Sequence, residues 1–247
     1  MDRMIYLAMS AAKQTMKAQA LAAHNLANIN TTGFKADFEA IRAVPVEGPG
    51  FDSRTFALTE RPGTNFAPGS IESTGRDLDL AVNGDGFIAV LAPDGTEAYT
   101  RAGDLMMTVN GQLQTGAGHP VIGNGGPIAV PQSQSLVIGT DGTISIRPLG
   151  QEANTLAQVD RIKLVNPSID QLSKGADGLF RMADGASAPA DASVRVTSGA
   201  LESSNVNSVA EMVRMIEHAR RYEMAVKAMN TARELDTASG RLLQLNG

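Results

Sequence analysis

Both ends of the chain carry a hydrophobic pattern of helical period. Near the N-terminus, small and apolar residues recur at alternating intervals of four and three, at Ile5, Met9, Ala12, Met16, Gln19, Ala23 and Leu26. This alternation keeps one seam on a helix that supercoils left-handedly against a partner. Near the C-terminus a wider apolar face consists of Met212, Met215, Ile216, Ala219, Tyr222, Val226 and Met229. We therefore predict a long helix at each end, and we expect the two to pair as a coiled coil.

The limits of the two helices are marked by residues that favour helix ends. The first helix is expected over about residues 3–28, because Asn, Thr and finally Gly33 follow it. The second is expected from Ser208, because Ser203–Asn207 offers several side chains that can cap a helix N-terminus.

Between the helices, from about residue 76, the pattern changes to short apolar runs separated by turn residues. Leu78–Val82 alternates, Asn83–Gly86 has turn composition and Phe87–Leu91 returns, which predicts a hairpin. Similar runs lie at 105–109, 128–130, 136–138, 144–146, 162–165, 179–182 and 194–196. Such regular short spacing predicts an antiparallel sandwich or a partial barrel.

The predicted fold is therefore mixed α and β, with an all-β domain inserted between two terminal helices. Residues 1–35 and 208–247 would form one discontinuous helical domain, and residues 76–207 a β-rich domain. Residues 36–75 are punctuated by proline and glycine and show no sustained period, so we expect an extended linker there.

Charge is distributed unevenly along the 247 residues. Residues 1–35 carry four basic and one acidic residue, residues 208–247 six and five, and residues 36–207 eleven and twenty, or −9. An acidic middle argues against a nucleic-acid groove, which needs clustered Lys and Arg. Arg220 and Arg221 are close to Glu211, Glu217 and Glu223, so we expect an ion-paired helix face there.

The side chains needed for catalysis or metal binding do not form a recognisable set. The three histidines, His24, His119 and His218, share no ligand spacing, and the chain has no cysteine. Asp77, Asp79 and Asp85 surround a turn but lack the spacing of a calcium loop, and the glycines of 123–126 precede a strand-like run. We therefore expect no enzyme activity, no catalytic residue, no cofactor, no metal and no small-molecule substrate.

The apolar run Met4–Met9 is too short for a membrane span, which needs about 18 consecutive apolar residues. We expect no membrane insertion. If the protein leaves the cytoplasm, we expect a route without a cleaved signal peptide.

Motifs at both ends of the chain resemble those of one protein family. The segment Asn25–Lys35, which contains Asn28, Asn30, Thr31, Gly33 and Phe34, resembles the N-terminal signature of bacterial flagellar axial proteins, the rod and hook family. The C-terminal signature is similar to Gly199–Asn207 and the helix after it, through Ser204, Asn205, Val206, Asn207, Arg220 and Glu223. Thr74–Phe87 and Ala98–Leu105 resemble the β-domain of the rod proteins.

The resemblance implies a structural subunit of the flagellar basal-body rod that crosses the periplasm. Its terminal helices would polymerise with copies of the chain and with other rod proteins, and the assembled rod would transmit torque from motor to hook. The flagellar type III apparatus would export it. Length and the segments Gly75–Asp79 and Gly126–Pro131 look most like the proximal rod members.

Three alternatives remain open. A distal rod or hook-family subunit is closest to the favoured interpretation. A β-domain enzyme or binding module could instead dimerise through its terminal helices, but it would need polar residues converging in a cleft. An N-terminal membrane-surface anchor would need bulky apolar residues where this helix has Ala.

Overall fold

The computed structural model describes residues 2–39, 41–45, 55–59, 63–148, 150 and 156–245. These residues divide into two compact units. The first, the helical unit, contains both long helices and the segment 36–65, and the second, the β-rich unit, contains residues 29–35 and 66–205. Residues 29–35 follow the first helix in sequence, yet they group with the strands.

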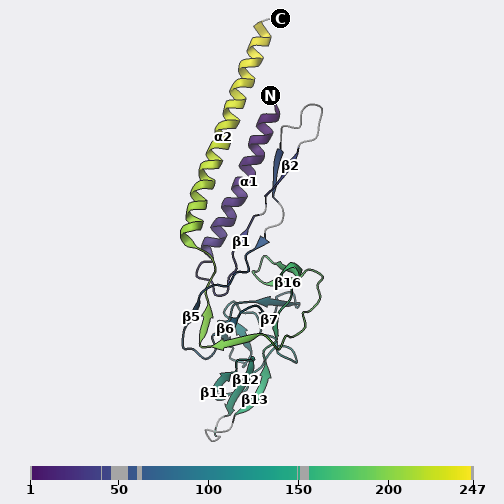
Figure 1. Ribbon diagram of the computed structural model, residues 1–247, viewed down its shortest axis with the longest axis vertical. Coiled ribbons are helices and arrows are strands. Elements are labelled where there is room, and N and C mark those ends of the chain that lie inside the picture. Colours follow the sequence, from purple (N-terminus) through teal and green to yellow (C-terminus); the bar gives the residue numbers. More distant parts are fainter. Residues whose placement is uncertain are drawn as a thin grey trace. The chain divides into compact units, whose positions relative to one another are not determined.

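Two antiparallel helices dominate the helical unit, α1 (Asp2–Ala27) and α2 (Ser208–Leu245), and they lie side by side (Figure 1). α1 contains neither Gly nor Pro and is rich in Ala, which has the highest helix propensity. The N-cap of α2 is Asn207, whose Oδ1 accepts a hydrogen bond from Ala210 N–H at 3.0 Å. Both helices and the start of α2 at Ser208 are as predicted.

Two short strand pairs complete the helical unit within the segment expected as a linker. β1 (Asp37–Phe38) pairs with β4 (Gly63–Thr64), and β2 (Ile41–Pro45) pairs with β3 (Thr55–Thr59). Buried Asn25 joins α1 to β1, because its side chain donates to Asp37 O at 2.8 Å and accepts from Asp37 N–H at 3.0 Å. Prolines Pro49 and Pro62, on which the linker prediction partly rested, lie outside the described residues.

The β-rich unit consists of antiparallel strands. One sheet has the order β14-β7-β8-β16-β15, a second has the order β11-β12-β13, and the pairs β17-β6, β18-β5 and β10-β9 complete the unit. Among the described strands, none of these sheets closes into a barrel. The bounds are β5 (Ile71–Ser73), β6 (Leu80–Asn83), β7 (Phe87–Leu91), β8 (Glu97–Thr100), β9 (Leu105–Met107), β10 (Leu113–Thr115), β11 (Ser133–Ile138), β12 (Thr143–Pro148), β13 (Ala157–Arg161), β14 (Leu164–Val165), β15 (Leu172–Lys174), β16 (Phe180–Met182), β17 (Arg195–Ser198) and β18 (Ala200–Glu202), with a short 3₁₀ helix, η1 (Ile169–Gln171), before β15.

The predicted hairpin of Leu78–Val82 with Phe87–Leu91 is wrong in its pairing. Both segments are strands, but β6 pairs with β17 and β7 pairs with β8 and β14. β7 is apolar at every position, so both of its faces need cover, and a place inside the larger sheet provides it.

The core of the β-rich unit lies on both faces of β7. Ile88 and Val90 belong to the larger hydrophobic cluster, to which Ile144 of β12 also contributes. Phe87 and Ala89 belong to a smaller cluster that contains Tyr99 and Phe180. Successive side chains of a strand point to opposite faces, so one strand serves two clusters. The mixed α and β class and the antiparallel central region are thus confirmed.

Replacing Ile88, which is fully buried, tests the role of β7. Ile88→Ala should lower the free energy of unfolding of the β-rich unit by about 3 kcal/mol, because it leaves a cavity between packed strands. The control Val137→Ala, at a half-exposed site in β11, should change it by less than about 1 kcal/mol. Amide hydrogen exchange of β7 measures both, and equal effects would contradict this account of the core.

Candidate functional site

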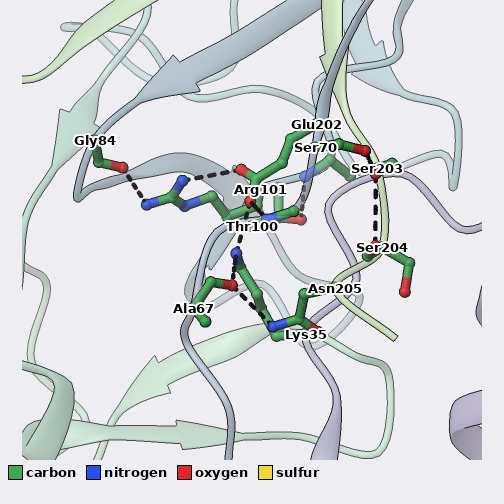
Figure 2. A network of polar contacts seen from close by, with 12 residues as sticks. Lys35, Ala67, Ser70, Gly84, Thr100, Arg101, Glu202, Ser203, Ser204 and Asn205 are labelled. Atoms are coloured by element: carbon green, nitrogen blue, oxygen red, sulfur yellow. Dashed lines mark hydrogen bonds and ion pairs between the residues drawn. The ribbon is translucent and has the colours of Figure 1, made fainter. Parts of the chain in front are cut away.

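The two signature segments of the chain meet around one buried carboxylate, that of Glu202 at the end of β18. Glu202 Oε1 accepts hydrogen bonds from Lys35 Nζ at 2.6 Å and from Gly69 N–H at 2.9 Å. Glu202 Oε2 accepts from Arg101 Nη1 at 2.9 Å (Figure 2). We call Lys35, Arg101 and Glu202 the Glu202 triad. It joins residues that are 167 and 101 positions apart in the sequence.

Each cation of the Glu202 triad also donates to a backbone carbonyl. Lys35 Nζ donates to Ala67 O at 2.9 Å, and Arg101 Nη2 donates to Gly84 O at 2.6 Å (Figure 2). The exposed fractions are 1% for Lys35, 5% for Arg101 and 1% for Glu202. Charges so deeply buried persist only when they are paired and hydrogen-bonded, and removal of one partner typically costs about 3–5 kcal/mol.

Burial and pairing act in opposite directions on Glu202. Burial raises the pKa of its carboxyl group, but the hydrogen bonds from Lys35 and Gly69 and the attraction of Arg101 outweigh burial. The pKa of Glu202 therefore lies below its ordinary value of 4.5. For Lys35, burial has the larger effect and lowers the pKa of the ammonium group despite the pairing with Glu202.

Gly33 brings the N-terminal signature against Arg101. Its N–H donates to the backbone O of Glu202 at 2.8 Å, and its φ of +65° is in the left-handed region that favours glycine. A Cβ atom at this position would lie 2.2 Å from the carbonyl carbon of Arg101. Any side chain at residue 33 would therefore force apart the two segments that supply the cations of the Glu202 triad.

Phe34 and Asn205 extend this contact. The backbone O of Phe34 accepts from Asn205 N–H at 3.3 Å, and Asn205 Nδ2 donates to Ala67 O at 2.8 Å. Lys174 lies over the Phe34 ring, 4.0 Å from its centroid, and donates to Lys35 O at 2.7 Å. Gly33, Phe34 and Asn205 were predicted as motif residues, and the structure brings them together.

The other predicted motif residues lie elsewhere. Within the helical unit, Asn28 Nδ2 donates to His24 O at 2.9 Å beside the last turn of α1, Val206 is buried, and Asn207 caps α2. Thr31 O accepts from Phe34 N–H at 3.2 Å in the β-rich unit. Asn30, Arg220 and Glu223 are exposed, and Ser204 is half-buried.

The residues predicted for subunit contact differ in exposure. Ala12 is buried, and the half-buried ones are Ile5, Gln19, Leu26, Met215, Ala219, Tyr222, Val226 and Met229. Met9, Met16 and Ala23 of α1 and Met212 and Ile216 of α2 are exposed. The less exposed stripe of α1 instead includes Ala8, Thr15 and Ala22, one residue before each exposed position of the predicted seam.

Of the acidic residues Asp77, Asp79 and Asp85, Asp79 stabilises a turn through hydrogen bonds within the protein. Asp79 accepts from Thr74 Oγ1 at 2.6 Å and from Arg76 Nε at 2.8 Å, as expected of a carboxylate that holds a turn. Across the described residues, no three His, Asp or Glu side chains are grouped as a metal site would require. None of the described helices has the length and apolar character needed to cross a membrane.

Sequence reasoning missed the Glu202 triad. Arg101 and Glu202 lie in the recognised segments Ala98–Leu105 and Gly199–Asn207, and Lys35 ends the N-terminal motif, but none was assigned a role. The available indication was a single charge in each of the segments Asn25–Lys35 and Gly199–Asn207, whereas Arg101 shares its segment with Asp104. Pairing charges so far apart in sequence requires the fold.

Three family profiles match the chain. "Flagella basal body rod protein" matches residues 5–35, "Flagellar hook protein FlgE/F/G D1 domain" matches residues 81–146, and "Flagellar basal body rod FlgEFG protein C-terminal" matches residues 197–242. The three matched ranges contain Lys35, Arg101 and Glu202, respectively, the residues of the Glu202 triad. The chain therefore belongs to the rod and hook class of flagellar axial proteins.

Sequence identity to individual rod proteins shows which member of this class the chain resembles. The flagellar basal-body rod protein FlgF of Escherichia coli K12 is 47% identical, over 99% of this chain and 98% of the relative. FlgF of Salmonella typhimurium LT2 is 44% identical over the full length of both, and FlgG of Bacillus subtilis 168 is 33% identical over 95% of this chain and 97% of the relative. The chain is a FlgF-type basal-body rod protein, a structural subunit and not an enzyme.

Gly33→Ala tests the close approach at the Glu202 triad. It should destabilise the β-rich unit by roughly 3 kcal/mol or more, because left-handed backbone strain adds to a clash with Arg101. Gly75→Ala is a matched control with a φ of +72° and open space around its Cβ position, and it should cost only about 1 kcal/mol. Urea unfolding compares the two, and equal losses would show that the contact with Arg101 is unimportant.

Acid should weaken the Glu202 triad. Because the pKa of Glu202 is lower in the folded state, its stabilising contribution is fully present above about pH 4.5 and is lost as pH falls through the folded pKa. Glu202→Gln should lower stability at pH 7 by about 3–5 kcal/mol and remove this part of the acid dependence.

The control for that experiment is Glu72→Gln, at an exposed position of β5 opposite β18, which should change stability by less than about 0.5 kcal/mol. Unfolding free energies measured between pH 3 and pH 7 provide the comparison. An unchanged acid dependence in Glu202→Gln would contradict the assignment to this carboxyl group.

Proposed function

We propose that this rod subunit polymerises through the exposed apolar faces of α1 and α2, with copies of itself and with other rod proteins. The observation that carries the proposal is a row of large apolar side chains left uncovered along both helices. On α1 it contains Tyr6, Met9 and Met16, with exposed fractions of 59%, 51% and 57%. On α2 it contains Val209, Met212, Val213, Ile216 and Met224.

An uncovered apolar row of this length is unusual for a monomer. Monomeric proteins rarely expose large contiguous apolar patches, and such patches commonly mark protein interfaces. On α1 the spacing of Tyr6, Met9, Met16 and Ala23 follows intervals of three and seven, so these side chains form one stripe. A second helix pair could cover this stripe without disturbing the contact between α1 and α2.

The finer architecture of each unit is also proposed here. We propose that α1 and α2 pair as a coiled coil, which is supported by the intervals of three and four between the less exposed residues Ala8, Ala12, Thr15, Gln19 and Ala22. A sandwich-like packing of the two larger sheets is supported by the larger hydrophobic cluster, which contains residues of β7 and β8 together with residues of β11 and β12. We also propose a division into a helical domain of 1–35 and 208–247, a linker of 36–75 and a β-rich domain of 76–207. This division differs from the two compact units, in which residues 29–35 group with the strands and residues 36–65 with the helices.

We place the chain in the proximal rod, in the periplasm, where it would transmit torque toward the hook. Higher identity to FlgF of Escherichia coli and of Salmonella typhimurium than to FlgG of Bacillus subtilis supports the proximal position over the distal one. Export by the flagellar type III apparatus without a cleaved signal peptide is proposed from family membership alone.

The helix faces can be tested without disturbing the fold. Met9→Gln combined with Met16→Gln should leave the monomer as stable as before, because both side chains are exposed, but should abolish swimming and rod completion. Because each Met is already about half buried, its full burial in an interface would contribute about 1 kcal/mol, and the loss of two such contacts per subunit is repeated along a polymer. Complementation of a deletion strain, scored by motility and by imaging of basal bodies, is the measurement.

A matched control changes the neighbouring side of the same helix. Ser10→Gln combined with Lys17→Gln introduces the same side chain at two positions outside the stripe and should restore motility. If the Met9 and Met16 double variant assembles rods as well as this control does, polymerisation through the α1 stripe is excluded.

A further inference from the structure

An open cavity of about 280 Å³ lies against the Glu202 triad, within the β-rich unit. Both cations of the Glu202 triad, Lys35 and Arg101, form part of its wall. The rest of the wall is supplied by Phe66, the turn Asp85–Phe87 and the segment Asn166–Ile169. The family assignment gives this cavity no role.

The two positively charged groups in the wall are paired with only one carboxylate. Lys35 and Arg101 share the single carboxylate of Glu202, and their remaining hydrogen bonds go to the carbonyl groups of Ala67 and Gly84. An ammonium and a guanidinium group have eight N–H donors between them. Arg101 Nε is buried and has no hydrogen-bond partner among the described residues. This nitrogen is itself enclosed, so the attraction for an added anion comes from the positive charge of Lys35 and Arg101 that Glu202 leaves unbalanced.

The remaining wall suits a carboxylate on a short aliphatic stem. The rings of Phe66 and Phe87 lie edge to face, 6.2 Å apart, and the Arg101 guanidinium lies 5.4 Å from the Phe87 centroid. Pro167 and Ile169 add further apolar surface. Such a wall can contact the methylene groups of an Asp or Glu side chain while Lys35 and Arg101 attract its carboxylate. Asp85, exposed at the cavity, opposes an incoming anion and lowers its affinity.

We propose that this cavity receives the carboxylate of an acidic side chain from a second copy of this chain. The inference rests on the proposed function, because it requires copies to lie next to one another. Charge complementarity supports this occupant: residues 36–207 carry eleven basic and twenty acidic residues, and Asp94 and Asp184 are exposed in turns of the same unit. Neighbouring copies therefore offer many carboxylates to Lys35 and Arg101 in the cavity wall.

The first test asks whether the cavity binds a carboxylate at all. The probe is sodium acetate, titrated into the full-length protein at constant ionic strength against sodium chloride, with the amide resonances of Gly86 and Ser168 recorded. We expect saturable shifts with acetate and none with chloride. Asp85→Asn should tighten acetate binding by about two- to threefold, because it removes a nearby negative charge without touching a buried group. Asp77→Asn, an exposed acidic position outside the cavity, should leave the affinity unchanged.

The second test identifies the occupant in assembled rods. A photo-crosslinking phenylalanine analogue replaces the exposed Ser168 at the cavity, and Asp77 in a control chain, in cells that remain motile. We expect an adduct of two copies of this chain from position 168, mapping to a segment with an exposed Asp or Glu, and none from position 77.

Each alternative result overturns the inference. Linear shifts, or equal affinity in the wild type and Asp85→Asn, would show that the cavity is not a carboxylate site. Acetate binding with an adduct to a different protein, or with no adduct, would exclude a second copy as the occupant. Neither result affects polymerisation through the helices, which the Met9 and Met16 double variant tests separately.

Discussion

The carboxylate of Glu202 is the constraint on which the β-rich unit depends most directly. Two cations, one after the first helix and one after β8, are buried against it, and each would be left uncompensated if the carboxylate moved. Buried ion pairs add little net stability compared with apolar packing, but loss of a single member is expensive. We infer that the Glu202 triad specifies which segments meet rather than how strongly they hold. Gly33 makes that meeting possible, because no side chain separates its backbone from that of Arg101.

The helical unit differs from the β-rich unit, because several of its large apolar side chains, among them Tyr6, Met9 and Met16, are exposed. Small residues such as Ala8, Ala12 and Ala22 occupy the less exposed stripe of α1, which lets helices approach closely. Met9 and Met16 are uncovered, and their flexible thioether side chains can adapt to neighbours that are similar but not identical. A rod built from several related proteins requires interfaces of this kind. The two units thus differ in physical character, with specific charge pairing in one and adaptable apolar packing in the other.

Several features could be predicted from the sequence, and the reasons for the misses are physical. The helices were predictable because helical period is local, and the start of α2 followed from a cap residue that acts within one turn, Asn207. The predicted seam and the less exposed stripe of α1 differ at Met9, Met16 and Ala23, since two heptad frames offset by one residue share Ile5, Ala12, Gln19 and Leu26. Which of the two frames faces a neighbour depends on the elements or subunits that pack against the helix. The pairing of β6 with β17 was missed because a turn sequence at Asn83–Gly86 predicts a hairpin only locally.

The amino-acid sequence by itself determined the class of the protein, because the mixed α and β order and the terminal signatures are properties of short segments. Only the tertiary structure decided that Lys35, Arg101 and Glu202 form one site, that residues 29–35 belong with the strands, and which faces of α1 are left uncovered. The physical reason is the separation along the sequence over which each interaction acts. Propensity, capping and turn chemistry act over a few residues, whereas the pairing of buried charges and the covering of apolar faces join residues more than a hundred positions apart.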